Sequence, residues 1–179
     1  MKTYNLVRTA VFAAMLCAVA PLAIYIGPIP LTFATFVIYM AGGVLGKKQA
    51  AVAVAVYILL GAFGLPVFSG FSGGFGRVVG PTGGYLVGYI PLAYLSGLFT
   101  ENETAPVRRG AVRGGLGMIL GTVALYVLGT AWFMIYNRTP LIPALSACVL
   151  PFLPGDAAKI AASALLAPII RRRVGRLSA

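Results

Sequence analysis

Two ionisable side chains, Asp156 and Lys159, lie three residues apart in an otherwise apolar stretch near the C-terminus. The chain's other two acids, Glu101 and Glu103, fall together in a distant polar stretch. Residues three apart share one face of a helix, and ionisable groups inside a bilayer are costly enough to indicate function. The pair therefore predicts a functional site, either for ligand binding or for catalysis. An internal ion pair that holds two helices together is the alternative.

Several catalytic chemistries are excluded by residues that the sequence lacks. It has no histidine, which rules out a His-based triad, an HExxH zinc site and a haem histidine. Cys17 and Cys148 lie alone in apolar stretches and are expected to be small core residues. Asp156 has no second acid nearby for a carboxylate pair. We therefore expect no enzyme, no cofactor and no metal site.

The composition is that of an integral membrane protein. The 179 residues are 60% hydrophobic and 9% charged, with a mean hydropathy of +0.95, which lies far from the average of soluble domains. No linker, low-complexity tract or repeat divides the chain, so residues 1–179 are expected to form one domain. The net charge of +11 comes from residues at the ends of apolar segments. This placement fits the anionic surface of a bilayer rather than a nucleic acid.

Charge-free runs predict an all-α bundle of six transmembrane helices. The expected spans cover about residues 6–26, 31–45, 49–63, 78–100 and 114–137, and a sixth span ends at Arg171–Arg173. A span needs about 20 apolar residues, so the second helix is short. We expect it to be kinked, tilted or shielded by its neighbours.

The lysine and arginine residues give the orientation. With both termini cytoplasmic, eleven of the fourteen fall inside, Arg77 and Arg138 fall outside, and Lys159 lies within a span. Positive charge favours the cytoplasmic side, so the distribution supports six spans. The N-terminal stretch also resembles a signal peptide, but its apolar length to Ile26 favours an uncleaved helix.

This orientation also gives the depth of the charged pair. Asp156 lies about 22 Å from the inner boundary, fifteen residues before Arg171. In a hydrocarbon core of about 30 Å, the pair is in the outer third, which suits a pocket that opens outward. Phe152 and Ser163 share its helix face.

A glycine-rich stretch over residues 68–85 joins the third and fourth helices on the outer side. Glycine lets the backbone approach a ligand closely, and the N–H groups of a helix beginning near Thr82 can bind an anionic or carbonyl oxygen. Arg77 adds a cation nearby. The alternative is a flexible surface loop whose aromatic residues anchor it to the membrane.

Four segments, in matching order over nearly the whole chain, resemble the BioY family. They are GPIPLT at 27–32, GAFGLPVF at 61–68, GPTGGY at 80–85 and PFLPGDAAK at 151–159. The family consists of the biotin-specific substrate-binding (S) components of energy-coupling factor (ECF) transporters. It often has a Gln after the first segment, where this chain has Phe33-Ala34-Thr35. No polar contact is carried over to that position.

The resemblance implies high-affinity capture of biotin at the outer face of the cell membrane by a multi-pass protein. The ligand-contacting Asp and Lys of the family correspond to Asp156 and Lys159. Biotin's ureido ring offers two N–H donors and one carbonyl acceptor, which these two side chains complement. The candidate contacts for the remainder of biotin are Arg77 and the N–H groups of Gly80, Thr82, Gly83 and Gly84 for polar atoms, and Val79, Tyr85 and Phe152 for the rings and chain.

Ala10, Ala14 and Ala18 form a stripe of small residues on the first helix, and small residues let helices approach closely in lipid. The resemblance implies that the stripe meets a transmembrane coupling protein, whereas packing within the bundle is the alternative. The sequence has no GxxxxGK[ST] motif, so ATP-driven uptake would need the two ATPase subunits of an ECF module. A solitary biotin facilitator is the second functional hypothesis, and a membrane enzyme is the third.

Overall fold

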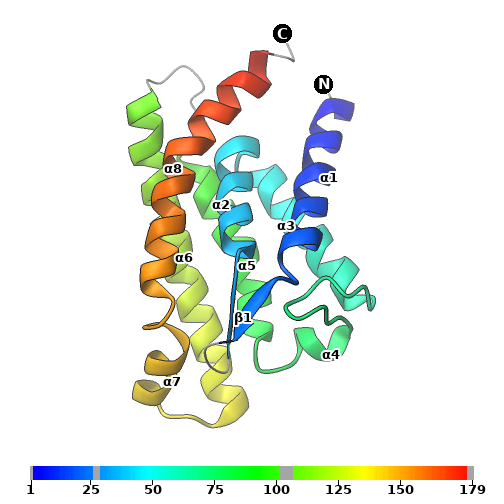
Figure 1. Ribbon diagram of the computed structural model, residues 1–179, viewed down its shortest axis with the longest axis vertical. Helices are drawn as coiled ribbons and strands as arrows, with labels where there is room; N and C mark the ends of the chain where they lie inside the picture. The colour runs from blue at the N-terminus through cyan, green and yellow to red at the C-terminus, as the bar shows by residue number, and fades with distance from the viewer. Residues whose placement is uncertain (1, 26–28, 101–106, 177–179) are drawn as a thin grey trace.

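The structure is a computed structural model that describes residues 2–25, 29–100 and 107–176. The six longest helices in these ranges are α1 (Lys2–Val19), α2 (Ala34–Leu45), α3 (Lys47–Ala62), α5 (Gly83–Leu98), α6 (Val107–Asn137) and α8 (Leu153–Arg176). The shorter elements are helices α4 (Phe75–Val78) and α7 (Leu141–Cys148) and strands β1 (Ala23–Tyr25) and β2 (Pro30–Thr32). The long helices form a bundle with both chain ends at the same end (Figure 1).

Helix α2 lies inside the bundle, where eleven of its 12 residues are buried. It packs against α1, α3, α5 and α8. A helix of this length rises about 18 Å, less than a hydrocarbon core of about 30 Å. As expected for the short second helix, neighbouring helices shield it. Its first turn begins inside the bundle, where Thr35 lines a cavity.

Close approach of α2 to its neighbours depends on two consecutive glycines. A Cβ atom at Gly42 would lie 2.6 Å from the Cβ of Ser96 in α5, and one at Gly43 would lie 2.4 Å from the Cβ of Ala167 in α8. Carbon atoms that are not bonded to each other do not come this close, so a larger residue would push the helices apart. Small residues at helix contacts are typical of membrane bundles.

The prediction that the first helix reaches Ile26 was wrong. Helix α1 ends at Val19, and Ala23–Tyr25 pairs with Pro30–Thr32 as an antiparallel hairpin. Pro21 explains the early end, because proline has no N–H to donate and disfavours helical backbone in the residue before it. Pro21 was a sign of this change that the prediction passed over, and the described chain is not entirely α-helical. The expected break at Gly27 and Pro28 lies outside the described residues.

Other helix boundaries also differ from the predicted spans. The second helix begins at Ala34 rather than Leu31, because Leu31 belongs to β2. The region predicted as one helix from Val78 contains the end of α4 and then α5, which begins at Gly83. Helix α6 starts seven residues before the predicted Gly114. Arginines end an apolar span without ending a helix, since arginine has high helix propensity. The short helix α7 was not predicted.

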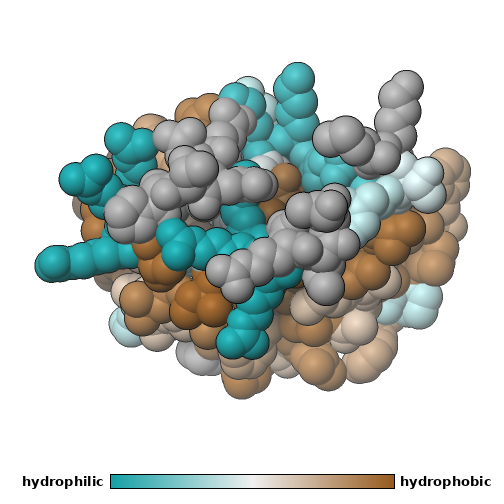
Figure 2. Space-filling view, turned by 90° about the horizontal axis from the view of Figure 1, so that it is seen from above, coloured by the Kyte–Doolittle hydropathy of each residue, from teal (hydrophilic) through white to brown (hydrophobic). Residues whose placement is uncertain are grey.

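The surface of the bundle is apolar around its sides and basic at one end. Helix α6 and the Leu153–Val174 part of α8 are, among the described residues, long and apolar enough to cross a bilayer. Figure 2 looks onto the end that carries both termini, where hydrophilic side chains gather above hydrophobic sides. We call this the basic end; it carries Lys47, Lys48, Arg108, Arg109, Arg113 and Arg171–Arg173. The hairpin, α4 and α7 lie at the opposite end.

The contact between α2 and α8 predicts the effect of one added methyl group. Gly43→Ala should lower the free energy of unfolding by about 1–3 kcal/mol, because the Cβ of Ala167 occupies its space. Adding Ala167→Gly should recover most of the loss. Gly115→Ala is the matched control, since its Cβ would lie 3.6 Å from that of Ala164, an ordinary contact. Unfolding measured in detergent tests this, and a Gly43→Ala protein as stable as the parent would contradict it.

Candidate functional site

The charged pair lies in the first two turns of α8. Lys159 Nζ is 3.0 Å from Asp156 Oδ1, and Asp156 is only 5% exposed. The N–H of Asp156 donates to the carbonyl of Phe152 at 2.8 Å, which starts the helix. Pro154 falls within the first turn, where a missing N–H leaves no bond unmade. A carboxylate at this position also gains from the positive end of the helix dipole.

Two further helices donate hydrogen bonds to the Asp156 carboxylate. Tyr126 of α6 donates its hydroxyl to Oδ2 at 2.7 Å, and Thr35 of α2 donates its hydroxyl to Oδ1 at 3.3 Å. With Lys159, the carboxylate has three protein donors. An ionised carboxylate has about four acceptor positions. It can therefore accept one more N–H, from a ligand, while keeping its protein partners.

Lys159 connects α8 to the hairpin and to the start of α2. Its Nζ donates to the backbone carbonyl of Thr32 at 2.8 Å, to the hydroxyl of Thr35 at 3.1 Å and to Asp156. The ring of Phe33 lies 5.9 Å from the same nitrogen. An ammonium has three N–H donors, and all three are used within the protein. A ligand acceptor would take one of these three N–H groups from its present protein acceptor. The hydroxyl of Thr35 can rotate to adjust to the loss of its bond from Lys159.

A cavity opens beside the pair between the hairpin, the glycine-rich segment, α5, α6 and α8. Its lining combines apolar and aromatic side chains with a smaller set of hydroxyls. The apolar set includes Leu31, Phe68, Leu86, Leu125 and Phe152, and the hydroxyl set includes Ser69, Ser72, Thr82 and Tyr89. This mixture is typical of sites for small organic molecules, where apolar walls bury the ligand and a few polar groups orient it.

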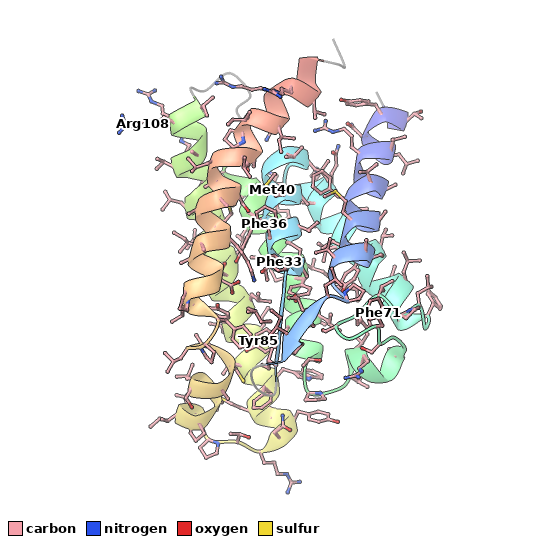
Figure 3. The ribbon with its side chains drawn as sticks, viewed as in Figure 1. Phe33, Phe36, Met40, Phe71, Tyr85 and Arg108 are labelled. Carbon is pink, nitrogen blue, oxygen red and sulfur yellow. The ribbon has the colours of Figure 1, made fainter. Side chains whose placement is uncertain are left out.

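Six of the ten residues predicted to bind the ligand line this cavity: Asp156, Lys159, Arg77, Thr82, Tyr85 and Phe152. Tyr85 is held as a wall, because its buried hydroxyl bonds Thr130 at 3.2 Å and the carbonyl of Cys148 at 3.3 Å. Tyr85 lies at the lower end of the bundle in Figure 3, between the hairpin and the α6 side.

The other four predicted residues lie outside the cavity lining. Val79 is exposed, and the buried carbonyl of Gly80 accepts a bond from Trp132 Nε1 at 2.9 Å. Gly83 packs against the backbone carbonyl of Val78 in α4, and Gly84 packs against α6, where a Cβ at Gly84 would lie 2.2 Å from that of Trp132. This close packing sets the start of α5 on α6. The glycines therefore position Tyr85, which lines the cavity, without lining it themselves.

Thr35 and Tyr126 donate hydrogen bonds to the carboxylate but were not predicted as site residues. Thr35 lies in an apolar run, where a threonine hydroxyl commonly bonds to its own helix, and Tyr126 lies in an apolar run, where a tyrosine is commonly part of the core. One signal pointed to Thr35. It lies in the stretch after the first family segment, where the family often has a polar Gln. Tyr126 lies thirty residues from Asp156, and only the packing of α6 on α8 makes them neighbours.

The alanine stripe on α1 lies on the outside of the bundle. Ala10, Ala14 and Ala18 are all exposed, whereas Ala13 and Leu16 are buried against the core. The stripe is flanked by exposed apolar residues, including Leu6, Val7, Val11 and Met15. This face of α1 makes no contact within the described chain that would explain its small residues.

The fold and the charged cavity define a helical membrane protein of the S-component class. The structure matches the crystal structure of the S-component for biotin from an ECF-type ABC transporter with a TM-score of 0.86 and 28% identity, over 96% of this chain and 92% of that one. The BioY family matches residues 1–176, and the chain belongs to that family. The resemblance of the four segments is thereby confirmed.

Two relatives match along nearly their whole length. The biotin transporter BioY of Thermotoga maritima is 39% identical over 164 residues, which cover 91% of this chain and 93% of the relative. The probable biotin transporter BioY of Pyrococcus horikoshii is 35% identical over 170 residues, covering 93% and 96%. Both are named as transporters, and the protein belongs with transporters rather than enzymes.

The ion pair makes a prediction about stability without ligand. Lys159→Met should lower the free energy of unfolding by about 3–5 kcal/mol, because it leaves Asp156 buried without its cation. Adding Asp156→Asn should recover a large part, since the uncompensated charge is then gone. Lys48→Met, at an exposed position, is the control and should have little effect. Additive losses in the double variant, measured by unfolding in mixed micelles, would show that the two charges are not coupled.

Proposed function

We propose that this protein captures biotin with high affinity in the cavity beside Asp156 and Lys159, as the S component of an ATP-driven ECF transporter. The observation that carries the proposal is the hydrogen bonding of the pair. A carboxylate with room for one more donor lies 3.0 Å from an ammonium that can exchange one acceptor, at the edge of a largely apolar cavity. The names of the relatives and of the matching crystal structure support biotin as the ligand.

The chemistry of biotin fits this arrangement. An N–H of the ureido ring can donate to Asp156, and the ureido carbonyl can accept from Lys159. The sulfur-containing ring and the aliphatic chain suit the walls formed by Phe152, Tyr85 and Leu125. Arg77 and the hydroxyl of Thr82 line the same cavity and are the candidates for the carboxylate of biotin. No cofactor is needed for binding of this kind.

We further propose six crossings of the cell membrane by a single domain, with both termini in the cytoplasm. The basic end then faces the anionic inner surface, as the distribution of lysine and arginine favours. The cavity then opens toward the outside, because the hairpin and the glycine-rich segment lie at the opposite end. Helix α2 spans only part of the bilayer, which its burial in protein permits.

The exposed alanine stripe on α1 is the proposed contact with a transmembrane coupling protein. Small side chains allow a partner helix to approach closely, and Ala10, Ala14 and Ala18 are open to the exterior. Two ATPase subunits would supply the energy, since the sequence has no phosphate-binding loop of its own. Uptake assays in cells with and without a coupling module would separate this function from solitary facilitation.

Biotin binding tests the site. Asp156→Asn turns an acceptor-only group into a mixed donor and acceptor, and Lys159→Ala removes the donor for the ureido carbonyl. Each should weaken biotin binding by at least about 1–3 kcal/mol, measured by calorimetry on protein shown to be folded. Val123→Ala, at an exposed position on α6, should bind like the parent. Unchanged affinity in both site variants would refute the assignment of the site.

A bulky residue in the stripe tests the proposed coupling surface. Ala14→Trp should leave biotin binding by the purified protein intact and abolish ATP-driven uptake, because it blocks close helix approach away from the cavity. Val123→Trp places the same side chain at an exposed position on α6 and should retain uptake. If Ala14→Trp loses binding as well as uptake, the stripe belongs to the packing of the bundle.

A further inference from the structure

Four large apolar side chains are exposed between the end of α3 and the start of α4, at the end opposite the termini. Phe63 is 85% exposed, Leu65 45%, Phe71 66% and Phe75 67%; we call them the outer aromatic patch. Burying such a side chain is worth about 1.5–3 kcal/mol relative to leaving it in water. Four together form a surface that a soluble loop would avoid.

The backbone at Phe71 is strained. Its φ is 54°, a left-handed conformation that is unusual for a bulky residue and costs about 1–3 kcal/mol. Hydrogen bonds hold the turn in place: Phe68 N to Ser72 O at 2.8 Å, Ser72 N to Phe68 O at 3.3 Å, and the hydroxyl of Ser72 to Ser69 O at 2.9 Å. Glycine or asparagine would fit here with less strain. The exposed ring of a phenylalanine at this strained position favours a contact from outside the chain.

The same turn also faces the cavity. Ser69 and Ser72 line the cavity, whereas Phe71 points away from the bundle in Figure 3. Phe68 packs the turn against α3. Its ring centroid is 5.6 Å from that of Tyr57, edge-on, and a Cβ at Gly61 would lie 2.2 Å from the Cζ atom of Phe68. One face of the turn thus forms a wall of the cavity, and the other carries the aromatic ring outward.

The outer aromatic patch continues the exposed face of α3. Val52, Val56 and Leu59 are exposed at spacings of four and three residues, so they form one stripe along the helix. Phe63 follows Leu59 by four residues, just past the end of α3, and extends the stripe into the patch. Lipid covers this stripe in the proposed membrane orientation, so lipid is the partner that is continuous with the patch.

We infer that the outer aromatic patch inserts into the outer leaflet, at the boundary between acyl chains and headgroups, and that lipid thereby holds the Ser69–Ser72 wall of the cavity in place. The inference rests on the proposed orientation of the bundle. Aromatic side chains are favoured at this depth. The contact with lipid offsets the strain at Phe71 and the exposure of its ring.

Spin labels at single cysteines test the insertion in phosphatidylcholine nanodiscs. Labels at Phe71→Cys and Phe75→Cys, with Cys17 and Cys148 replaced by alanine, should relax more with oxygen, which enters the bilayer, than with a water-soluble nickel chelate. Leu59→Cys is the lipid control, and Arg138→Cys, an exposed position after α6, is the water control. Labels at 71 and 75 that respond like Arg138 would overturn the inference. Spin–spin coupling between two copies would also overturn it and assign the patch to self-association.

The controls separate this inference from the proposed orientation. If Leu59→Cys also reports water, the membrane placement of α3 fails, and the proposed function with it. If Leu59→Cys reports lipid while the patch reports water, only the inference fails.

As a second readout, Phe71→Asn removes the ring and relieves the backbone, and should speed biotin release from nanodiscs by about threefold to tenfold. Phe71→Leu should release biotin like the parent, and an unchanged rate in Phe71→Asn would refute the role of lipid in holding the wall.

Discussion

The rest of the structure depends on the need to keep two opposite charges inside an apolar bundle. A buried ion pair is tolerated only when its remaining hydrogen-bonding positions are filled, since each desolvated ion costs several kcal/mol. Asp156 and Lys159 meet this need with groups from three other elements: Tyr126 on α6, Thr35 on α2 and the Thr32 carbonyl of β2. The pair thus joins the elements that surround the cavity. The same hydrogen bonds fix the positions of the donor and acceptor that the proposed ligand would meet.

The short central helix α2 lets the hydrogen bonds of the charged pair form inside the bundle, because Thr35 lies in its first turn. Helix α2 can begin in the middle of the bundle because protein surrounds it on nearly every side. Its two consecutive glycines bring α5 and α8 into direct contact with its backbone. At the C-terminal end of α2, Arg8 of α1 donates to the carbonyl of Val44 at 3.0 Å. Helix α2 thus contacts α1 at one end and the cavity at the other, where Thr35 lies beside the charged pair.

The glycine-rich segment has two roles, which are to pack the start of α5 against α6 and to form one wall of the cavity. The carbonyl of Gly80 accepts a bond from Trp132, and Gly84 fits closely against the same side chain, which gives the start of α5 its place on α6. The turn at residues 68–72 has serines on the cavity side and a strained phenylalanine on the outer side. Breaking a local conformational rule is typical of functional positions. In the proposed arrangement, that position lies between the ligand and the surrounding lipid.

Composition and charge were enough to predict a helical membrane bundle. Apolar runs are stable in lipid and basic flanks are stable at the membrane surface, so each segment's residues indicate its surroundings. The four motifs were enough to predict the family, and the spacing of Asp156 and Lys159 was enough to place them on one helix face. The end of α1 at Val19, the hairpin and the helix α7 were missed, since an apolar run fits strand and helix alike. The partners Thr35 and Tyr126 were decided only by tertiary structure. Their hydroxyls are distant from Asp156 along the chain, and only the packing of three helices against one another brings them to its carboxylate.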